Sequence, residues 1–229
     1  MKVEIFTAIK NEENILPFFI NHYRTAFPDC IINFYDNNST DNSVEICKLQ
    51  YCNVFDFPDF IPYVKEEILI DLKNNIWKNS SADWIIICDV DELLQINSEE
   101  IKSLSDNVNV ISTKGYNMID ITSDNLPVEQ LTHGNYAPPY NKNIMFKNKS
   151  VQEINYTLGA HQCNPLPNPI FSSKIFKLLH YNKYGFTLET FRKRFEIINQ
   201  SKSKKELMLF EEVSKKLFEG SQLSAIKLL

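Results

Sequence analysis

Glycine is scarce in this chain, and no long apolar run occurs. Only 5 of its 229 residues are glycine, and none lies in the loop of residues 8–12, where a Gly-rich phosphate-binding loop would follow the first apolar segment. The longest apolar stretches, such as residues 84–88, are far shorter than the ~20 residues needed to cross a bilayer. Glu4 and Lys10 interrupt the apolar stretch that a signal peptide would require. We therefore expect no transmembrane segment and no secretory leader.

Cysteine pairs and a positive net charge are also missing. The five cysteines are an odd number and none forms a CxxC pair, so we expect neither a disulfide framework nor a zinc knuckle, and a cytoplasmic location. The net charge is −5 at pH 7 and the pI is about 5.5, which argues against nonspecific nucleic-acid binding. The charge is uneven, because residues 187–229 hold nine basic and six acidic residues. The body of the chain is therefore acidic and its last fifth is basic.

Apolar periodicity predicts alternating strands and helices over the first ~95 residues. The expected strands are residues 3–9, 31–35, 53–57 and 84–88, and the expected helices between them are residues 15–27, 42–51 and 63–78. This alternation indicates an α/β fold with right-handed crossovers. The continuous apolarity of residues 84–88 is typical of a strand that is covered on both faces.

The second half of the chain is less regular and richer in aromatic residues and proline. We expect strands at residues 108–113, 143–147, 151–157 and 174–181, which would complete a mixed sheet, and amphipathic helices at residues 187–199 and 204–218. No internal repeat and no low-complexity linker interrupts the sequence. We therefore predict one domain over residues 1–186, with a C-terminal helical extension, residues 187–229, packed on it.

Polar clusters follow three of the predicted strands. Residues 7–11 come after the first strand, residues 36–41 after the second and residues 89–92 after the fourth. In open α/β sheets the ligand sits outside the carboxyl ends of the strands. Because all three clusters are expected at that edge, the sequence predicts the functional site there.

The pair Asp89 and Asp91 is the most informative of these features. Two carboxylates directly beyond a buried strand can turn toward one divalent cation, although a solvated turn is the ordinary alternative for such a pair. A hard Mg²⁺ or Mn²⁺ ion held by few carboxylates keeps room for phosphate oxygens, so a nucleotide diphosphate is the expected ligand. Asp36 would then accept a hydrogen bond from the base or the ribose, its alternative role being a helix N-cap.

The order and spacing of these motifs resemble the family-two-like glycosyltransferases of the GT-A fold. The resemblance extends from about Val3 to Arg194. The segments that carry it are Lys10-Asn11-Glu12-Glu13, Phe19-Ile20-Asn21-His22-Tyr23, Tyr35-Asp36-Asn37-Asn38-Ser39-Thr40-Asp41, Cys88-Asp89-Val90-Asp91-Glu92-Leu93-Leu94, Gly159-Ala160-His161-Gln162, Leu178-Leu179-His180-Tyr181-Asn182-Lys183 and Phe191-Arg192-Lys193-Arg194. The resemblance implies a Rossmann-like mixed sheet flanked by helices.

The resemblance also implies a role for individual residues. Asp36 would contact the base, Asp89 the ribose or the metal, and Asp91 the metal that bridges the diphosphate. A further metal ligand is often a late histidine, and His180 is the better-placed candidate with His161 as its rival; a neutral imidazole suits Mn²⁺. The residues expected to line the nucleoside pocket are Thr7, Ala8, Asn11 and Glu12.

The implied reaction moves a sugar from a nucleotide-diphosphate donor, with a UDP-sugar favoured, to a hydroxyl of a saccharide or lipid-linked acceptor. The family further suggests a role in bacterial surface polysaccharide or glycoconjugate synthesis. An inverting reaction needs a carboxylate that takes the acceptor's proton. The sequence departs from the commoner family pattern here, because it has no Glu-Asp pair opening a mid-chain helix and no QxxRW box. Asp120 and Glu153 are the candidate bases, and surface acids are their alternative reading.

The basic C-terminal segment leaves two interpretations open. Arg192 and Arg194 would close over the diphosphate, or they form a solvated basic helix face. An amphipathic basic helix also suits peripheral contact with an anionic membrane, here at its inner face. Two other functions for the whole chain remain as alternatives: a sugar-phosphate nucleotidyltransferase, disfavoured by the missing glycine loop, and a noncatalytic carbohydrate-binding domain, disfavoured by the intact Asp89 and Asp91.

Overall fold

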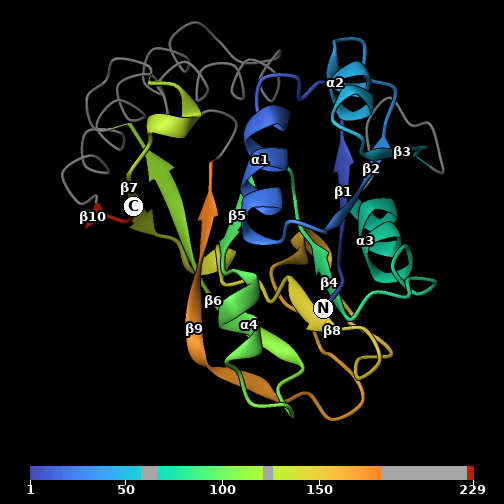
Figure 1. The fold of residues 1–229 in the computed structure, drawn as a ribbon, viewed down its shortest axis with the longest axis vertical. Coiled ribbons are helices and arrows are strands. Elements are labelled where there is room, and N and C mark those ends of the chain that lie inside the picture. Colours follow the sequence, from blue (N-terminus) through green and yellow to red (C-terminus); the bar gives the residue numbers. More distant parts are fainter. Residues whose placement is uncertain (58–65, 121–125, 182–225) are drawn as a thin grey trace, which may run out of the picture.

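The computed structural model describes residues 1–57, 66–120, 126–181 and 226–229. Its centre is a mixed sheet of ten strands with helices on its faces (Figure 1). The α/β class predicted from the sequence is confirmed.

The first half of the chain forms the parallel part of this sheet. Its strands are β1 (Val3–Ile9), β2 (Ile31–Asp36), β3 (Asn53–Asp56) and β4 (Trp84–Ile87), and its helices are α1 (Leu16–Ala26), α2 (Ser43–Leu49) and α3 (Glu66–Asn75). All of these elements were predicted, with small differences at their ends. β1 pairs in parallel with β2 on one side and β4 on the other, so the carboxyl ends of three strands meet at one edge.

Alternate residues of the central strands supply two cores, one on each face of the sheet. Ile5 and Ile86 belong to a large cluster with α1, whereas Phe6 and Ile85 belong to a second cluster with Trp77, beyond the end of α3. All four residues of β4 are buried, which is why its sequence is apolar without alternation. α1 contributes side chains three and four residues apart to the large cluster: Leu16, Phe19, Ile20 and Tyr23.

The second half adds mostly antiparallel strands. They are β5 (Glu92–Gln95), β6 (Val110–Ile119), β7 (His133–Tyr136), β8 (Met145–Lys147), β9 (Phe171–His180) and β10 (Ile226–Lys227), with α4 (Ser98–Lys102) after β5 and the short helices η1 (Val128–Gln130), η2 (Pro138–Tyr140) and η3 (Leu158–Ala160) between strands. β5 runs antiparallel to β9, and β9 runs parallel to β6. The order of the strands in the sheet is β10-β7-β6-β8-β4-β1-β2-β3, and β9 pairs with both β6 and β5. This arrangement extends the sheet beside α1 (Figure 1).

Several sequence predictions for this half need correction. β5, α4, β7 and β10 were not predicted, and β6 and β9 are longer than expected. Residues 151–157 are not a strand: Glu153 forms a single bridge with Leu166, and Asn155 has a positive φ of 52°. The backbone N–H of Tyr156 donates to Asn74 Oδ1 (2.8 Å) on α3, so side-chain hydrogen bonds replace a ladder there.

The predicted C-terminal helices, residues 187–199 and 204–218, lie outside the described residues, as does the proposed domain boundary at residue 186. In the described parts of the chain, no helix has the length and apolarity that a membrane span requires.

Candidate functional site

A cavity of about 330 Å³ opens at the carboxyl ends of β1 and β4, the edge predicted to hold the site. Its wall combines the end of β1, the turn after β4, the end of β9 and loops from the second half of the chain. The lining residues are Ala8, Glu12, Asp89, Val90, Asp91, Tyr140, Lys142, Gly159, His161 and His180. The cavity lies at the edge of the sheet where the sequence predicts a site. Eight of its lining residues belong to the motifs or to the residues with predicted roles: Ala8, Glu12, Asp89, Val90, Asp91, Gly159, His161 and His180.

The turn between β4 and β5 positions both carboxylates. The N–H of Cys88 still donates to Phe6 O (3.3 Å) in β1, and the N–H of Glu92 then donates back to Asp89 O (3.0 Å), which reverses the chain. The N–H of Asp89 donates to Glu92 Oε2 (3.1 Å). These bonds close the turn, so the two side chains of the motif have fixed and different surroundings.

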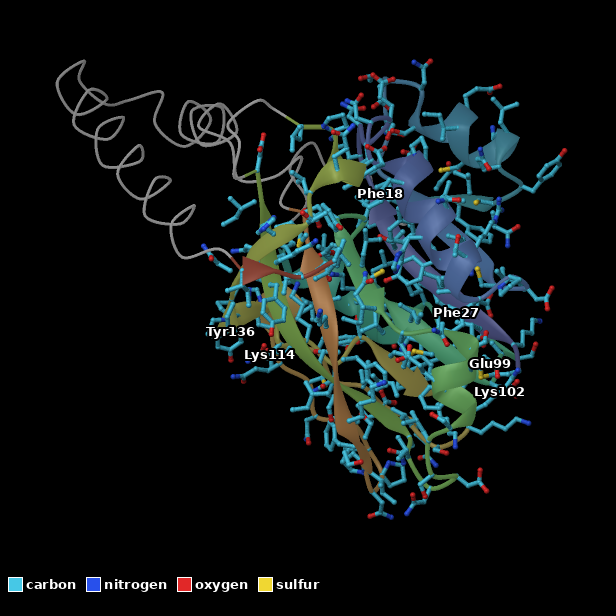
Figure 2. All side chains as sticks on the ribbon, turned by 60° about the vertical axis from the view of Figure 1, so that its left-hand side comes forward. Phe18, Phe27, Glu99, Lys102, Lys114 and Tyr136 are labelled. Carbon is cyan, nitrogen blue, oxygen red and sulfur yellow. The ribbon has the colours of Figure 1, made fainter. Side chains whose placement is uncertain are left out.

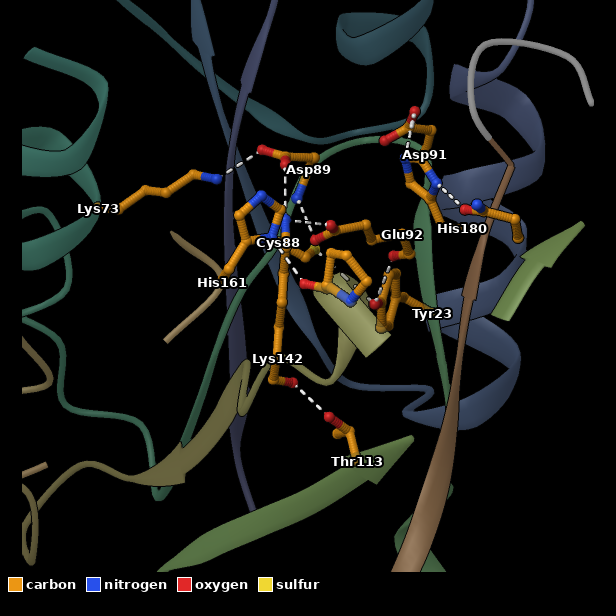
Figure 3. Close-up of polar contacts among 12 residues, drawn as sticks. Tyr23, Lys73, Cys88, Asp89, Asp91, Glu92, Thr113, Lys142, His161 and His180 are labelled. Carbon is orange, nitrogen blue, oxygen red and sulfur yellow. Dashed lines mark hydrogen bonds and ion pairs between the residues drawn. The ribbon is translucent and has the colours of Figure 1, made fainter. Parts of the chain in front are cut away.

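Asp89 is paired with two lysines (Figure 3). Lys73 Nζ, from α3, lies 2.6 Å from Asp89 Oδ1, and Lys142 Nζ lies 3.4 Å from Asp89 Oδ2. The two lysine side chains are 6% and 3% exposed, whereas that of Asp89 is 40% exposed. Although burial opposes ionisation, the nearby ammonium groups outweigh it and hold the pKa of Asp89 well below its usual value. Asp89 is therefore an ionised carboxylate with one side toward the cavity.

Lys142 also forms a buried ion pair with Glu92. Lys142 Nζ lies 2.5 Å from Glu92 Oε1, and the Glu92 side chain is 1% exposed. Burial, and then the neighbouring Asp89 charge, raise the pKa of Glu92. Burial alone would lower the pKa of Lys142, but the charges of Glu92 and Asp89 raise it above its usual value. Lys142 is thus a buried cation that two carboxylates hold in place.

Asp91 faces His180, at the end of β9. His180 Nε2 lies 3.4 Å from Asp91 Oδ2, and the two side chains are 7% and 14% exposed. The register of β5 on β9 pairs Glu92 with His180, and the N–H of Tyr181 donates to Asp91 O (2.8 Å). The antiparallel pairing of two strands therefore brings together residues 89 positions apart in the sequence.

The orientation of the His180 ring is fixed from two sides. Nδ1 lies 2.8 Å from Asn117 Oδ1, and the ring stacks on Tyr140 with centroids 3.8 Å apart and an interplanar angle of 19°. With Nδ1–H donating to the Asn117 oxygen, the lone pair of Nε2 points toward the Asp91 carboxylate. A lone pair and a carboxylate in contact require a cation or a proton between them. The pair Asp91 and His180 therefore fits a divalent cation.

The described residues offer no group of three or more His, Cys, Asp and Glu side chains around a common point. A cation at Asp91 and His180 would have two protein ligands, since both oxygens of Asp89 face ammonium groups. Mg²⁺ and Mn²⁺ accept such sites when a phosphate-bearing ligand and water complete the coordination.

His161, the rival to His180, has a different environment. Its Nδ1 lies 2.6 Å from Pro139 O, and its ring contacts the edge of Tyr140, with centroids 5.9 Å apart. The preceding Gly159 has φ +75°, and a Cβ there would lie 2.5 Å from the His161 ring. His161 therefore closes one wall of the cavity, whereas His180 is the histidine paired with Asp91.

Three residues assigned to the nucleoside pocket do not line the cavity: Thr7, Asn11 and Asp36. Thr7 is buried, and the N–H of Asn11 donates to Ser39 Oγ (2.9 Å). Asp36 accepts hydrogen bonds from the N–H and the hydroxyl of Ser39 (3.2 and 2.5 Å). The turn after β2 is thus tied to the loop after β1, next to the cavity.

Neither candidate base lines the cavity. Asp120 is 2% exposed at the end of β6 and accepts from the N–H of Leu126 (2.9 Å). Glu153 pairs with Lys78, its oxygen 2.7 Å from Nζ. The predicted lid residues Arg192 and Arg194 lie outside the described residues.

The sequence did not indicate three neighbours of the two aspartates: Lys73, Lys142 and Asn117. Each is a polar residue in a segment predicted as a helix, a loop or a strand, and no spacing in the sequence links it to the motif. A lysine on the buried side of α3 was the one available signal, because an unpaired lysine is almost never buried.

No protein-family model and no curated protein matches the sequence. Solved structures do match the fold. TarS from S. aureus, residues 1–349, aligns with 95% of this chain and 69% of its own, at TM-score 0.51 and 13% identity. Its complex with UDP aligns with 95% of this chain and 70% of its own, at TM-score 0.53 and 12% identity.

A structure of glucosyl-3-phosphoglycerate synthase from Mycobacterium tuberculosis, in complex with Mn²⁺, UDP-glucose and phosphoglyceric acid, aligns with 50% of this chain and 43% of its own, at TM-score 0.35 and 16% identity. The long alignment with TarS shows that this chain has the GT-A fold, as its motifs indicated.

Proposed function

We propose that the chain is a metal-dependent glycosyltransferase that moves a sugar from a nucleotide-diphosphate donor to an acceptor hydroxyl. The observation that carries this proposal is the pair Asp91 and His180, with Asp89 beside it, in a cavity at the carboxyl edge of a GT-A sheet. A phosphohydrolase or a nucleotidyltransferase has less support, because neither a pair of aspartates one residue apart nor a glycine loop follows β1.

Each residue of the cavity has a role in this proposal. Asp91 and His180 would hold Mn²⁺ or Mg²⁺, which supplies Lewis-acid stabilisation of the leaving diphosphate. The exposed side of Asp89 accepts a hydrogen bond from a donor hydroxyl. The nucleoside would lie along the loops after β1 and β2, from Ala8 and Glu12 toward Asp36.

UDP is the favoured nucleotide, because a TarS structure that shares this fold is in complex with UDP. We extend the proposal to a hexosyl donor and to a saccharide or lipid-linked acceptor in bacterial surface polysaccharide or glycoconjugate synthesis. We also propose that Arg192 and Arg194 contact the diphosphate and that the basic C-terminal segment contacts a membrane surface. These finer assignments rest on the sequence motifs.

The first test measures thermal stability of the purified chain with UDP, GDP, CDP and TDP, with and without Mn²⁺. Ligand that binds the folded state raises the unfolding temperature by mass action. We expect one nucleotide, UDP, to stabilise the protein only with metal, and Asp91→Ala to abolish the effect. Glu99→Ala is the matched control: Glu99 pairs with Lys102 on α4 (Figure 2), and neither residue lines the cavity. No stabilisation by any nucleotide at millimolar concentration would refute the donor site.

A further inference from the structure

The two aspartates of the motif differ in how their charge is balanced. Each oxygen of Asp89 has its own ammonium group, from Lys73 (2.6 Å) and Lys142 (3.4 Å). Among the described residues, Asp91 has one ionisable partner, His180. The motif that looks symmetric in the sequence is therefore asymmetric in space.

The two lysines, here called the lysine pair (Lys73 and Lys142), are held in place. Their side chains are 6% and 3% exposed, and Lys142 is also anchored on buried Glu92 at 2.5 Å. Separating a lysine this deeply buried from its carboxylate costs free energy, because the ammonium group would lose its charged partner without gaining full contact with water. A cation that used Asp89 as a ligand would have to displace an ammonium group and then remain beside it.

We propose that the lysine pair keeps Asp89 out of metal coordination, so that a divalent cation binds firmly only together with the nucleotide diphosphate. This inference rests on the proposed function. The free site offers the cation two protein ligands, Asp91 and His180, because the lysine pair occupies both oxygens of Asp89. The diphosphate supplies the missing oxygen ligands.

The test removes one charge of the lysine pair. Lys73→Met deletes the ammonium group that contacts Asp89 Oδ1 and leaves the buried pair of Lys142 and Glu92 intact. One oxygen of Asp89 then becomes available to a cation, and the local charge becomes more negative by one unit. We expect nucleotide-free Mn²⁺ binding, measured by electron paramagnetic resonance of the unbound ion, to tighten about tenfold.

Three further variants make the result specific. Adding Asp89→Asn to Lys73→Met should reverse the gain, because the released carboxylate is what binds the ion. Lys73→Gln, which keeps a hydrogen-bond donor without the charge, should show the same gain if the methionine variant fails to fold. Lys78→Met is the matched control, since Lys78 forms an equally short ion pair with Glu153 (2.7 Å) outside the cavity.

The outcomes separate this inference from the proposed function. Wild-type protein that binds Mn²⁺ with UDP and weakly without it, together with tighter nucleotide-free binding in Lys73→Met, supports the inference. If the wild type behaves in this way but folded Lys73→Met and Lys73→Gln bind nucleotide-free Mn²⁺ no better, the inference is overturned and the proposed function stands. Wild-type protein that binds no Mn²⁺ even with UDP overturns both.

Discussion

Replacement of Lys142 by methionine tests the energetics of the site directly. The change removes the cation that lies 2.5 Å from Glu92 Oε1 while both side chains are almost fully buried, at 3% and 1% exposure. Glu92 would be left as a buried carboxylate without its partner, and Asp89 would keep Lys73 alone. Breaking a buried pair from one side typically costs about 3–5 kcal/mol.

That loss is a large share of the roughly 5–15 kcal/mol that stabilises a typical domain. We expect Lys142→Met to lower the free energy of unfolding, measured by urea denaturation at pH 7.5, by about 3–5 kcal/mol. Lys142→Met combined with Glu92→Gln removes the uncompensated charge and should recover at least about half of the loss.

The matched comparison is Lys102→Met, which breaks an exposed pair with Glu99 and should change the stability by less than about 1 kcal/mol. A loss below about 1 kcal/mol for Lys142→Met, or a double variant less stable than the single one, would refute the argument that this buried pair is energetically coupled.

Three further predictions concern other parts of the fold. Phe19→Ala should lower the free energy of unfolding by about 3–5 kcal/mol in urea titrations, because Phe19 is fully buried on α1. Gly159→Ala should lower the unfolding temperature, since φ is +75° and the new Cβ meets the His161 ring; unchanged stability would contradict this. Burial raises the pKa of Cys30 to about 11, although the charge of Arg24 partly opposes the shift. Because the thiolate is the reactive form, alkylation of Cys30 at pH 8, measured by mass spectrometry, should be about 100-fold slower than that of a thiol of pKa 9. The rate should increase about tenfold per pH unit toward pH 11.

Local sequence patterns were sufficient for the parallel half of the sheet. β4 is apolar throughout because both of its faces are covered, and β1 alternates between two cores, so their composition alone revealed strands. The Asp89–Asp91 motif could be placed at the edge of the sheet, because it directly follows a buried apolar strand and therefore lies where that strand ends.

The prediction of residues 151–157 as a strand was wrong because apolar alternation does not report hydrogen-bond partners. Val151, Ile154 and Tyr156 are buried as expected, but the backbone turns at Asn155 and the N–H of Tyr156 bonds to the side chain of Asn74. β5 was missed for a related reason, because its four residues follow the motif directly and pair with β9, far away in the sequence.

The sequence was sufficient to predict the α/β class, the succession of strands and helices along the first half of the chain and the edge of the sheet at which the carboxylates gather, because these depend on apolar periodicity and on where buried strands end. The partner of each carboxylate depends on the tertiary structure and could not be predicted from the sequence. The register of β5 on β9 places His180 at Asp91, and α3 and the loop before β8 bring Lys73 and Lys142 to Asp89. Such contacts join residues 16 to 89 positions apart, and the free energy of a charge depends on its neighbours in space.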